Sequence, residues 1–175
     1  LSSCPCPLNP SRAEITRMQS SFVGELFNRH RKKRLFPVMA DLIALHGALN
    51  RSLYAGPLCA TAAGGVDENT VFCLSPGTIC LALNYDFDAL MTVGELTFEA
   101  FLDTYRAQKT FLVIYNDGGV VKTEILDRDL VRLLGALTGA ETLRQVCVKG
   151  NIKIQKKIFD FLEHAVNEQM IRTVS

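Results

Sequence analysis

The stretch that decides the fold is Phe111-Leu-Val-Ile-Tyr-Asn-Asp-Gly-Gly-Val-Val-Lys-Thr-Glu-Ile-Leu126. Two runs rich in β-branched and aromatic residues flank Asn116-Asp117-Gly118-Gly119, a set of residues that tolerates positive φ. In the second run, apolar and polar side chains alternate with the period of a half-buried strand: Val120, Lys122 and Glu124 on one face, and Val121, Thr123 and Ile125 on the other. The stretch therefore predicts a β-hairpin whose tight turn has at least one residue at positive φ.

The composition sets the outer limits. The chain has 175 residues, of which 48% are hydrophobic, so it is long enough to form a domain with a real core. Its 19 basic and 18 acidic residues leave a net charge of +1, which provides no overall attraction to nucleic acid or membrane. Only 21% of the residues are charged and the mean hydropathy is +0.15. Excess apolar surface of this kind is typical of a subunit in a complex.

The N-terminal part of the chain predicts a helical arm over residues 11–55. Residues 1–10, with three prolines, predict a disordered leader. Ser11-Arg12-Ala13-Glu14 forms a capping box, and the apolar spacing after it predicts a helix to about Arg29. Pro37 is placed to open a second helix. Its expected buried face consists of Val38, Leu42, Leu45, Leu49 and Leu53.

The remainder, residues 70–175, predicts a sheet covered by helices. Val71–Leu74 and Thr78–Leu83 flank the turn sequence Ser75-Pro76-Gly77 and predict a second hairpin. Helices are expected at Leu96–Gln108, from Asp127 to a stop at Thr138-Gly139, at Glu141–Val148, and from Asn151 onward. The expected apolar side of the last helix consists of Ile154, Ile158, Phe161, Leu162, Ala165 and Val166.

The expected fold class is α+β: a small antiparallel sheet of two hairpins, flanked by helices and preceded by the helical arm. Residues 11–175 are expected to form one domain. The alternative is a winged-helix-like fold, in which helices near 86–91 and 96–108 form a pair and the 111–126 hairpin is the wing. In that fold the recognition helix would carry Glu95, Glu99 and Asp103, whose charges repel phosphate, so even this alternative favours binding to protein.

The six cysteines and the scattered acidic residues do not predict a metal or a cofactor. Cys4 and Cys6 lack the partners that a zinc site needs, and Cys73 and Cys80 are expected to be buried, reduced and unreactive in strand interiors. Asn84, Asp86, Asp88 and Glu95 have partial calcium-loop spacing, but Ala89 occupies the position that requires glycine. Free cysteines favour an intracellular protein, cytoplasmic or nuclear.

Catalytic patterns are also missing from the sequence. The three histidines, His30, His46 and His164, are not part of a metalloprotease motif, and the chain has no nucleophile elbow or phosphate-binding glycine loop. We therefore expect a protein that is not an enzyme.

Two groups of residues are candidates for binding. The basic run offers possible phosphate contacts or an import signal, while a solvated helix end is the simpler interpretation: Arg29, Arg31, Lys32, Lys33 and Arg34. The apolar residues around that run are the expected partner-binding surface: Phe22, Leu26, Phe27, Leu35 and Phe36.

The sequence thus favours a non-enzymatic protein–protein interaction domain, a subunit or adaptor that docks through a helical apolar face. The expected partner is another protein or a second copy of the chain. The alternative is a nucleic-acid-associated protein that uses Arg29–Arg34 together with the lysines of 153–157.

Overall fold

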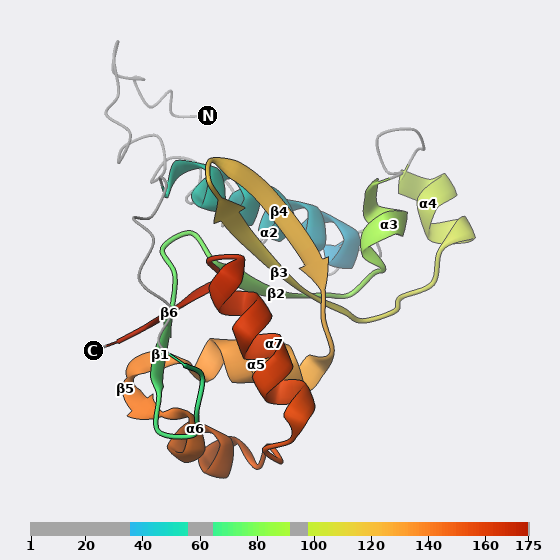
Figure 1. Ribbon diagram of the computed structural model, residues 1–175. Coiled ribbons are helices and arrows are strands. Elements are labelled where there is room, and N and C mark those ends of the chain that lie inside the picture. The colour runs from blue at the N-terminus through green and yellow to red at the C-terminus, as the bar shows by residue number, and fades with distance from the viewer. Residues whose placement is uncertain (1–35, 56–64, 92–97, 175) are drawn as a thin grey trace, which may run out of the picture.

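The computed structural model describes residues 36–55, 65–91 and 98–174 (Figure 1). The helices in these ranges are α2 (Phe36–Tyr54), α3 (Phe87–Met91), α4 (Phe98–Thr104), α5 (Arg128–Ala136), α6 (Leu143–Gly150) and α7 (Lys156–Asn167). The strands are β1 (Val71–Leu74), β2 (Ile79–Leu83), β3 (Thr110–Asp117), β4 (Val120–Ile125), β5 (Thr138–Thr142) and β6 (Ile171–Thr173). They form two antiparallel three-stranded sheets with helices packed against them, which confirms the α+β class.

The hairpin predicted from residues 111–126 is confirmed. Strands β3 and β4 pair from Leu112 opposite Ile125 to Asp117 opposite Val120, leaving a two-residue turn of Gly118 and Gly119. Both glycines have positive φ, 58° and 96°, as a type I′ turn requires. The Gly119 N–H also donates to Asn116 Oδ1 over 2.8 Å, which ties the turn to the strand before it.

The second predicted hairpin is wrong. Strand β1 lies between β5 and β6, whereas β2 pairs with β3 in the other sheet, so the two strands flanking Ser75-Pro76-Gly77 never meet. The turn itself forms, because the Thr78 N–H donates to the Ser75 carbonyl and Gly77 has a φ of 87°. Turn residues determine where the chain reverses direction, but they do not determine which strands the two flanking segments pair with.

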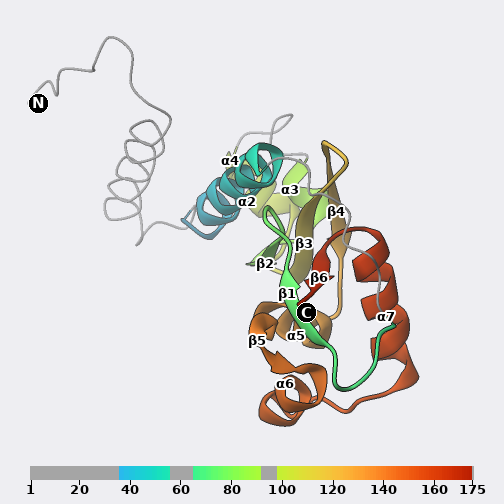
Figure 2. The same ribbon diagram turned by 60° about the vertical axis from the view of Figure 1, so that its left-hand side comes forward.

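Strand β3 is the centre of the molecule. It pairs with β2 on one side and with β4 on the other, so the hairpin belongs to a sheet and is not an isolated wing. Because strand side chains alternate, Val113 and Tyr115 enter one hydrophobic core and Leu112 and Ile114 enter another. Figure 2 shows the consequence: α2, α3 and α4 lie on one side of this sheet, and α5, α6 and α7 lie with the second sheet on the other.

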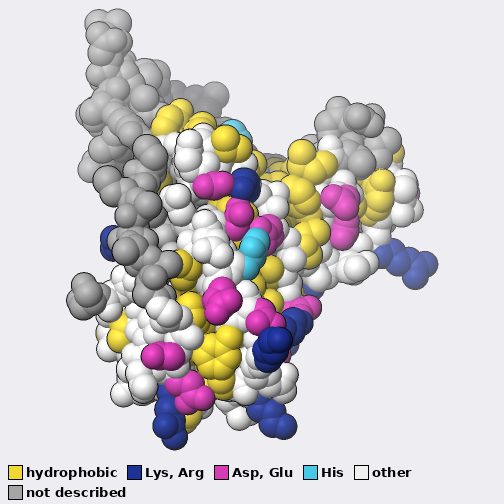
Figure 3. Space-filling view, in the orientation of Figure 1, with side chains coloured by type: hydrophobic (Ala, Val, Ile, Leu, Met, Phe, Trp, Pro, Cys, Tyr) yellow, Lys and Arg dark blue, Asp and Glu magenta, His cyan; other side chains and the backbone are white. Residues whose placement is uncertain are grey.

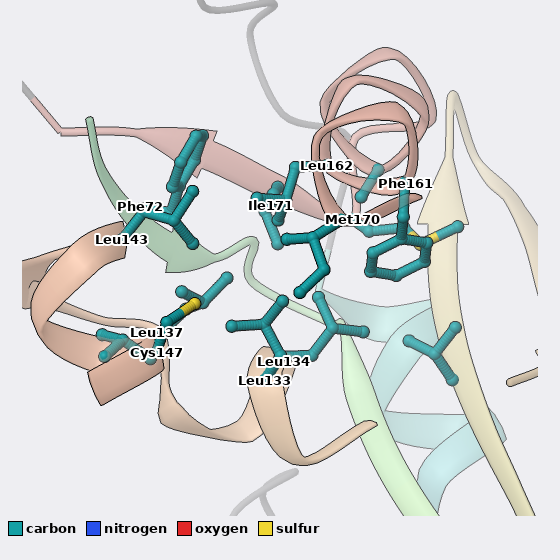
Figure 4. Packing of buried hydrophobic residues seen from close by; sticks show 14 of the residues in the cluster. Phe72, Leu133, Leu134, Leu137, Leu143, Cys147, Phe161, Leu162, Met170 and Ile171 are labelled. Atoms are coloured by element: carbon teal, nitrogen blue, oxygen red, sulfur yellow. The ribbon is translucent and has the colours of Figure 1, made fainter. Parts of the chain in front are cut away.

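The core on the α5–α7 side is the larger one. Leu133 and Leu134 of α5 meet Leu162 of α7, and Phe72 of β1 packs nearby with Ile171 of β6 (Figure 4). All five side chains are at most 2% exposed. The predicted apolar face of the last helix is confirmed, since its buried residues are Ile158, Phe161, Leu162 and Ala165.

Helix α2 packs on the opposite face of the sheet. The predicted helix is confirmed and two of its expected core residues, Val38 and Leu45, are buried, but the buried stripe also contains Asp41, Ala48 and Ser52. Leu53 was expected to be buried and is 50% exposed. The reason is that the buried stripe of α2 is rotated about the helix axis toward Asp41, Ala48 and Ser52. No helix in the described ranges is both long and apolar enough to cross a membrane.

Three boundaries in the last third differ from the prediction. Thr138-Gly139 stops α5 but then begins a strand, β5, that pairs with β1. Helix α6 begins after the capping box formed by Thr142 and Gln145, and Asn151 ends it in the left-handed conformation, with a φ of 51°, instead of starting the next helix. The chain then reaches α7 only at Lys156, and β6 follows it as a strand that the sequence did not predict.

Candidate functional site

Most predicted binding residues lie outside the described part of the chain. These are the partner-binding candidates Phe22, Leu26, Phe27 and Leu35, and the basic residues Arg29, Arg31, Lys32, Lys33 and Arg34. The structure describes one member of the set, Phe36, which begins α2 and is half-buried.

The face of α2 that points away from the sheet carries few charged residues. At 100° per residue, Met39, Ile43 and Gly47 lie opposite the buried stripe of Asp41, Leu45 and Ala48. The same face holds His46 and Asn50, whose side chains hydrogen-bond to each other over 2.9 Å. The helix has two residues with full charges over its 19 positions, Asp41 and Arg51, and Asp41 is buried. The outer face thus has only one charged side chain, where a surface helix normally carries several.

Asp41 fixes the position of α2. Its Oδ2 accepts the backbone N–H groups of Asn84, over 2.7 Å, and Tyr85, over 2.9 Å, while its Oδ1 accepts the Asn84 side-chain amide over 2.9 Å. Burial raises the pKa of Asp41, and these three hydrogen bonds offset part of that effect. The sequence signal was an isolated acid in an apolar helix, but its partners, more than 40 residues away, could not be identified.

A charged network joins the hairpin to the end of α7, and Figure 3 shows acidic, basic and histidine side chains gathered on one face of the molecule. The buried Tyr115 hydroxyl donates to Glu124 Oε1 over 2.6 Å and lies 3.2 Å from Glu168 Oε2. Lys122 Nζ bridges Asp117 at 2.7 Å and Glu168 at 2.6 Å. His164 Nε2 lies 3.2 Å from both carboxylate oxygens of Glu124.

The pKa shifts in this network are those of a structural contact between the hairpin and α7, and not those of a reactive centre. Burial, and next the hydrogen bond to Glu124, raise the pKa of Tyr115, so its hydroxyl remains a donor. Hydrogen bonds to Asp117 and Glu168 raise the pKa of Lys122, and the bond from Lys122 lowers the pKa of Glu168. Lys122 is thereby held as a cation between two carboxylates, which is not the state of a nucleophilic or basic lysine.

The two strand cysteines are free and half-buried rather than fully buried. Burial raises the pKa of Cys80 to about 11, in keeping with the predicted unreactive thiol. The surroundings of Cys73 differ from the prediction, since Arg172 Nε donates to Cys73 Sγ over 3.1 Å. The sequence neighbours of Cys73 are apolar, and only the pairing of β1 with β6 brings a positive charge to it.

The partial calcium loop has a structural use in its described residues. Asp86 Oδ1 accepts the backbone N–H groups of Asp88, over 3.0 Å, and Ala89, over 3.2 Å, so it caps the first turn of α3. Within residues 36–55, 65–91 and 98–174, no group of three His, Cys, Asp or Glu side chains is arranged to hold a metal ion. In comparisons with known proteins, no family model and no curated protein matches the chain.

Proposed function

We propose that the protein is a non-enzymatic protein-binding domain, a subunit or adaptor that docks another protein through the outer face of α2. The proposal rests on one observation: the face of α2 opposite its buried stripe has a single fully charged residue, Arg51, and combines the half-buried Met39 and Ile43 with the polar pair His46 and Asn50. An apolar helical stripe at a protein surface is the common basis of helix-mediated recognition.

The position of this face supports the proposal. Asp41 and the core residues Val38 and Leu45 hold the helix firmly on the sheet, so its outer side is presented on a rigid support. Rigid presentation lowers the entropy that binding must overcome. Phe36, at the start of the helix, belongs to the predicted partner-binding set, and Leu53, at its other end, is half-exposed.

The test compares charge insertions on α2 with one elsewhere. Ile43→Glu and Leu53→Glu place a charge on or beside the outer face, and Val148→Glu is the matched control on α6, where the side chain is 73% exposed. Proteins captured by each variant from cells are quantified by mass spectrometry, with the melting temperature measured alongside. We expect the two α2 variants to lose a specific partner that the wild type and the control retain. Retention of every partner by folded α2 variants would contradict the proposal.

Nucleic-acid association is the second candidate, and the observation that favours it is the exposure of Lys153 and Lys156 at the start of α7. Neighbouring lysines are less available, because Lys157 pairs with Asp127 at 2.5 Å and Lys149 pairs with Glu141. Binding to RNA or DNA would have to weaken steeply with rising salt. For either function the proposed location is intracellular, in the cytoplasm or the nucleus, since the described cysteines are free.

A further inference from the structure

Strand β4 is an outer strand of its sheet among the described residues (Figure 2). Its pairing with β3 determines which of its backbone groups point outward. The two-residue turn makes Asp117 and Val120 a hydrogen-bonded pair. At the other end, the Leu126 N–H donates to the Phe111 carbonyl over 2.9 Å. Because hydrogen-bonded pairs alternate along an antiparallel ladder, the even-numbered residues bond to β3. Val121, Thr123 and Ile125 therefore turn their N–H and C=O groups to the open edge.

An open edge with exposed β-branched side chains is a template for another strand. Thr123 is exposed, Val120 is 62% exposed and Ile125 is 58% exposed. We propose that a second copy of this chain pairs with β4 in antiparallel orientation, with Thr123 opposite Thr123 of the second copy. The β2–β3–β4 sheet of one copy and that of the second copy then form one continuous six-stranded sheet across a two-fold axis.

Charge selects this register. Outward-facing residues must oppose one another, so the registers that overlap most of the strand are centred on Lys122, Thr123 or Glu124. The first places Lys122 against Lys122 of the second copy, and the last places Glu124 against Glu124. The register centred on Thr123 places Lys122 of each copy opposite Glu124 of the other copy, which gives two pairs of unlike charges. Like charges directly opposite one another are destabilising and unlike charges are stabilising.

The remaining side chains are also self-complementary in this register. On the α2 face of the sheet, Val121 lies opposite Ile125 of the second copy, with the two threonines between these pairs. On the α7 face, Val120 lies opposite Leu126 of the second copy, outside the two charged pairs. Pairing covers the exposed Val120 and Ile125 and leaves no charge facing its own kind.

The monomer already holds the charged pair in place. Lys122 is bound by Asp117 and Glu168, and Glu124 is bound by Tyr115 and His164, so both side chains have lost much of their freedom before association. The surface is nevertheless small, and we expect a dissociation constant on the order of 10–100 µM.

The experiment exploits the residue on the two-fold axis. Sedimentation velocity of the full chain over a concentration series should show a monomer–dimer equilibrium. Thr123→Lys and Thr123→Glu each bring like charges together on the axis and should each be monomeric. An equimolar mixture of the two variants should restore a dimer, because the introduced lysine of one copy then faces the introduced glutamate of the other. Val148→Lys and Val148→Glu, on exposed α6, are the matched controls and should dimerise as the wild type does.

A second measurement does not depend on any variant. Amide hydrogen exchange of the wild type should show protection of Val121, Thr123 and Ile125 that rises with protein concentration, while that of Lys122 and Glu124 changes little. A wild type that stays monomeric throughout, or a dimer that both Thr123 variants leave intact, would overturn the proposal. The outcome is independent of partner docking, because Ile43→Glu and Leu53→Glu leave the β4 edge unchanged.

Discussion

At the residue scale, Asp41 is the side chain on which the position of α2 most directly depends. A buried carboxylate is costly unless its oxygens are satisfied, and here three N–H groups from Asn84 and Tyr85 satisfy them. The bonds join a helix to a loop 43 and 44 residues further along the chain. Asp41 therefore ties α2 to the Asn84–Tyr85 segment, beside the hydrophobic core on the α2 side of the sheet.

Replacing Asp41 by alanine leaves these donors without an acceptor and should lower the free energy of unfolding by about 2–4 kcal/mol. Asp41→Asn should lower the free energy of unfolding by less. The oxygen of the introduced amide can accept both backbone N–H groups, and its NH₂ group can donate to the Asn84 side-chain oxygen once the Asn84 amide rotates. Urea denaturation of the three proteins measures the difference. Equal losses from both substitutions would mean that the hydrogen bonds contribute little.

The raised pKa of Asp41 also gives the comparison a pH dependence. The Asp41 carboxyl binds its proton more tightly in the folded protein than in the unfolded chain. Protonation of Asp41 therefore adds to the free energy of unfolding at low pH, and this contribution is lost as pH rises through the pKa of Asp41 in the folded protein. The asparagine side chain of the Asp41→Asn variant does not titrate. The stability of this variant relative to the wild type should therefore increase as pH rises from about 4, which urea denaturation at a series of pH values measures.

At the element scale, the β3–β4 hairpin depends on its two glycines in different degrees. Gly118 has a φ of 58°, within the left-handed region that asparagine tolerates, whereas Gly119 has a φ of 96°, which disfavours any side chain. An added Cβ meets nothing within 4 Å at either position, so backbone strain alone decides the outcome.

Gly119→Val should destabilise the protein by about 1–2 kcal/mol, while Gly118→Asn should stay within about 0.5 kcal/mol of the wild type. Thermal denaturation followed by circular dichroism gives both values. The valine variant isolates strain from crowding, since the space around the turn is open. If Gly118→Asn proved as costly as Gly119→Val, the turn would differ from the type I′ geometry.

At the scale of the whole molecule, β3 couples two hydrophobic cores. Leu112 is fully buried on the α2 side and Val113 is fully buried on the α7 side, one residue apart. Neither core can lose β3 without exposing the other. We therefore expect the two sheets to unfold together in one cooperative transition.

Leu112→Ala and Val113→Ala should each lower stability, by roughly 2–5 kcal/mol for leucine and somewhat less for valine, while the transition stays single. Calorimetry and far-ultraviolet circular dichroism should report the same midpoint for each variant. Val148→Ala, at an exposed position, should shift it little. Two separate transitions in either core variant would show that the cores are independent.

Local chemistry in the sequence was enough to predict the hairpin, α2 and the apolar face of α7. Each depends on residues a few positions apart: a glycine turn between β-branched runs, a proline at a helix start, or a 3.6-residue apolar period. The α+β class follows from that order of elements. The partner-binding and phosphate-contact sets lie outside the described residues, apart from Phe36, and the binding role of every member remains a prediction.

Tertiary structure alone decided which strands pair and which side chains meet. The prediction that β1 would pair with β2 was wrong, because strands of three to five residues such as β5 and β6 have too little local pattern to be recognised as its partners. The approach of Arg172 to Cys73, and of Lys122 to Glu168, follows from packing between segments 46 or more residues apart. Turns and periodicity determine local conformation, whereas pairing is selected by the burial of surfaces that are distant in the chain.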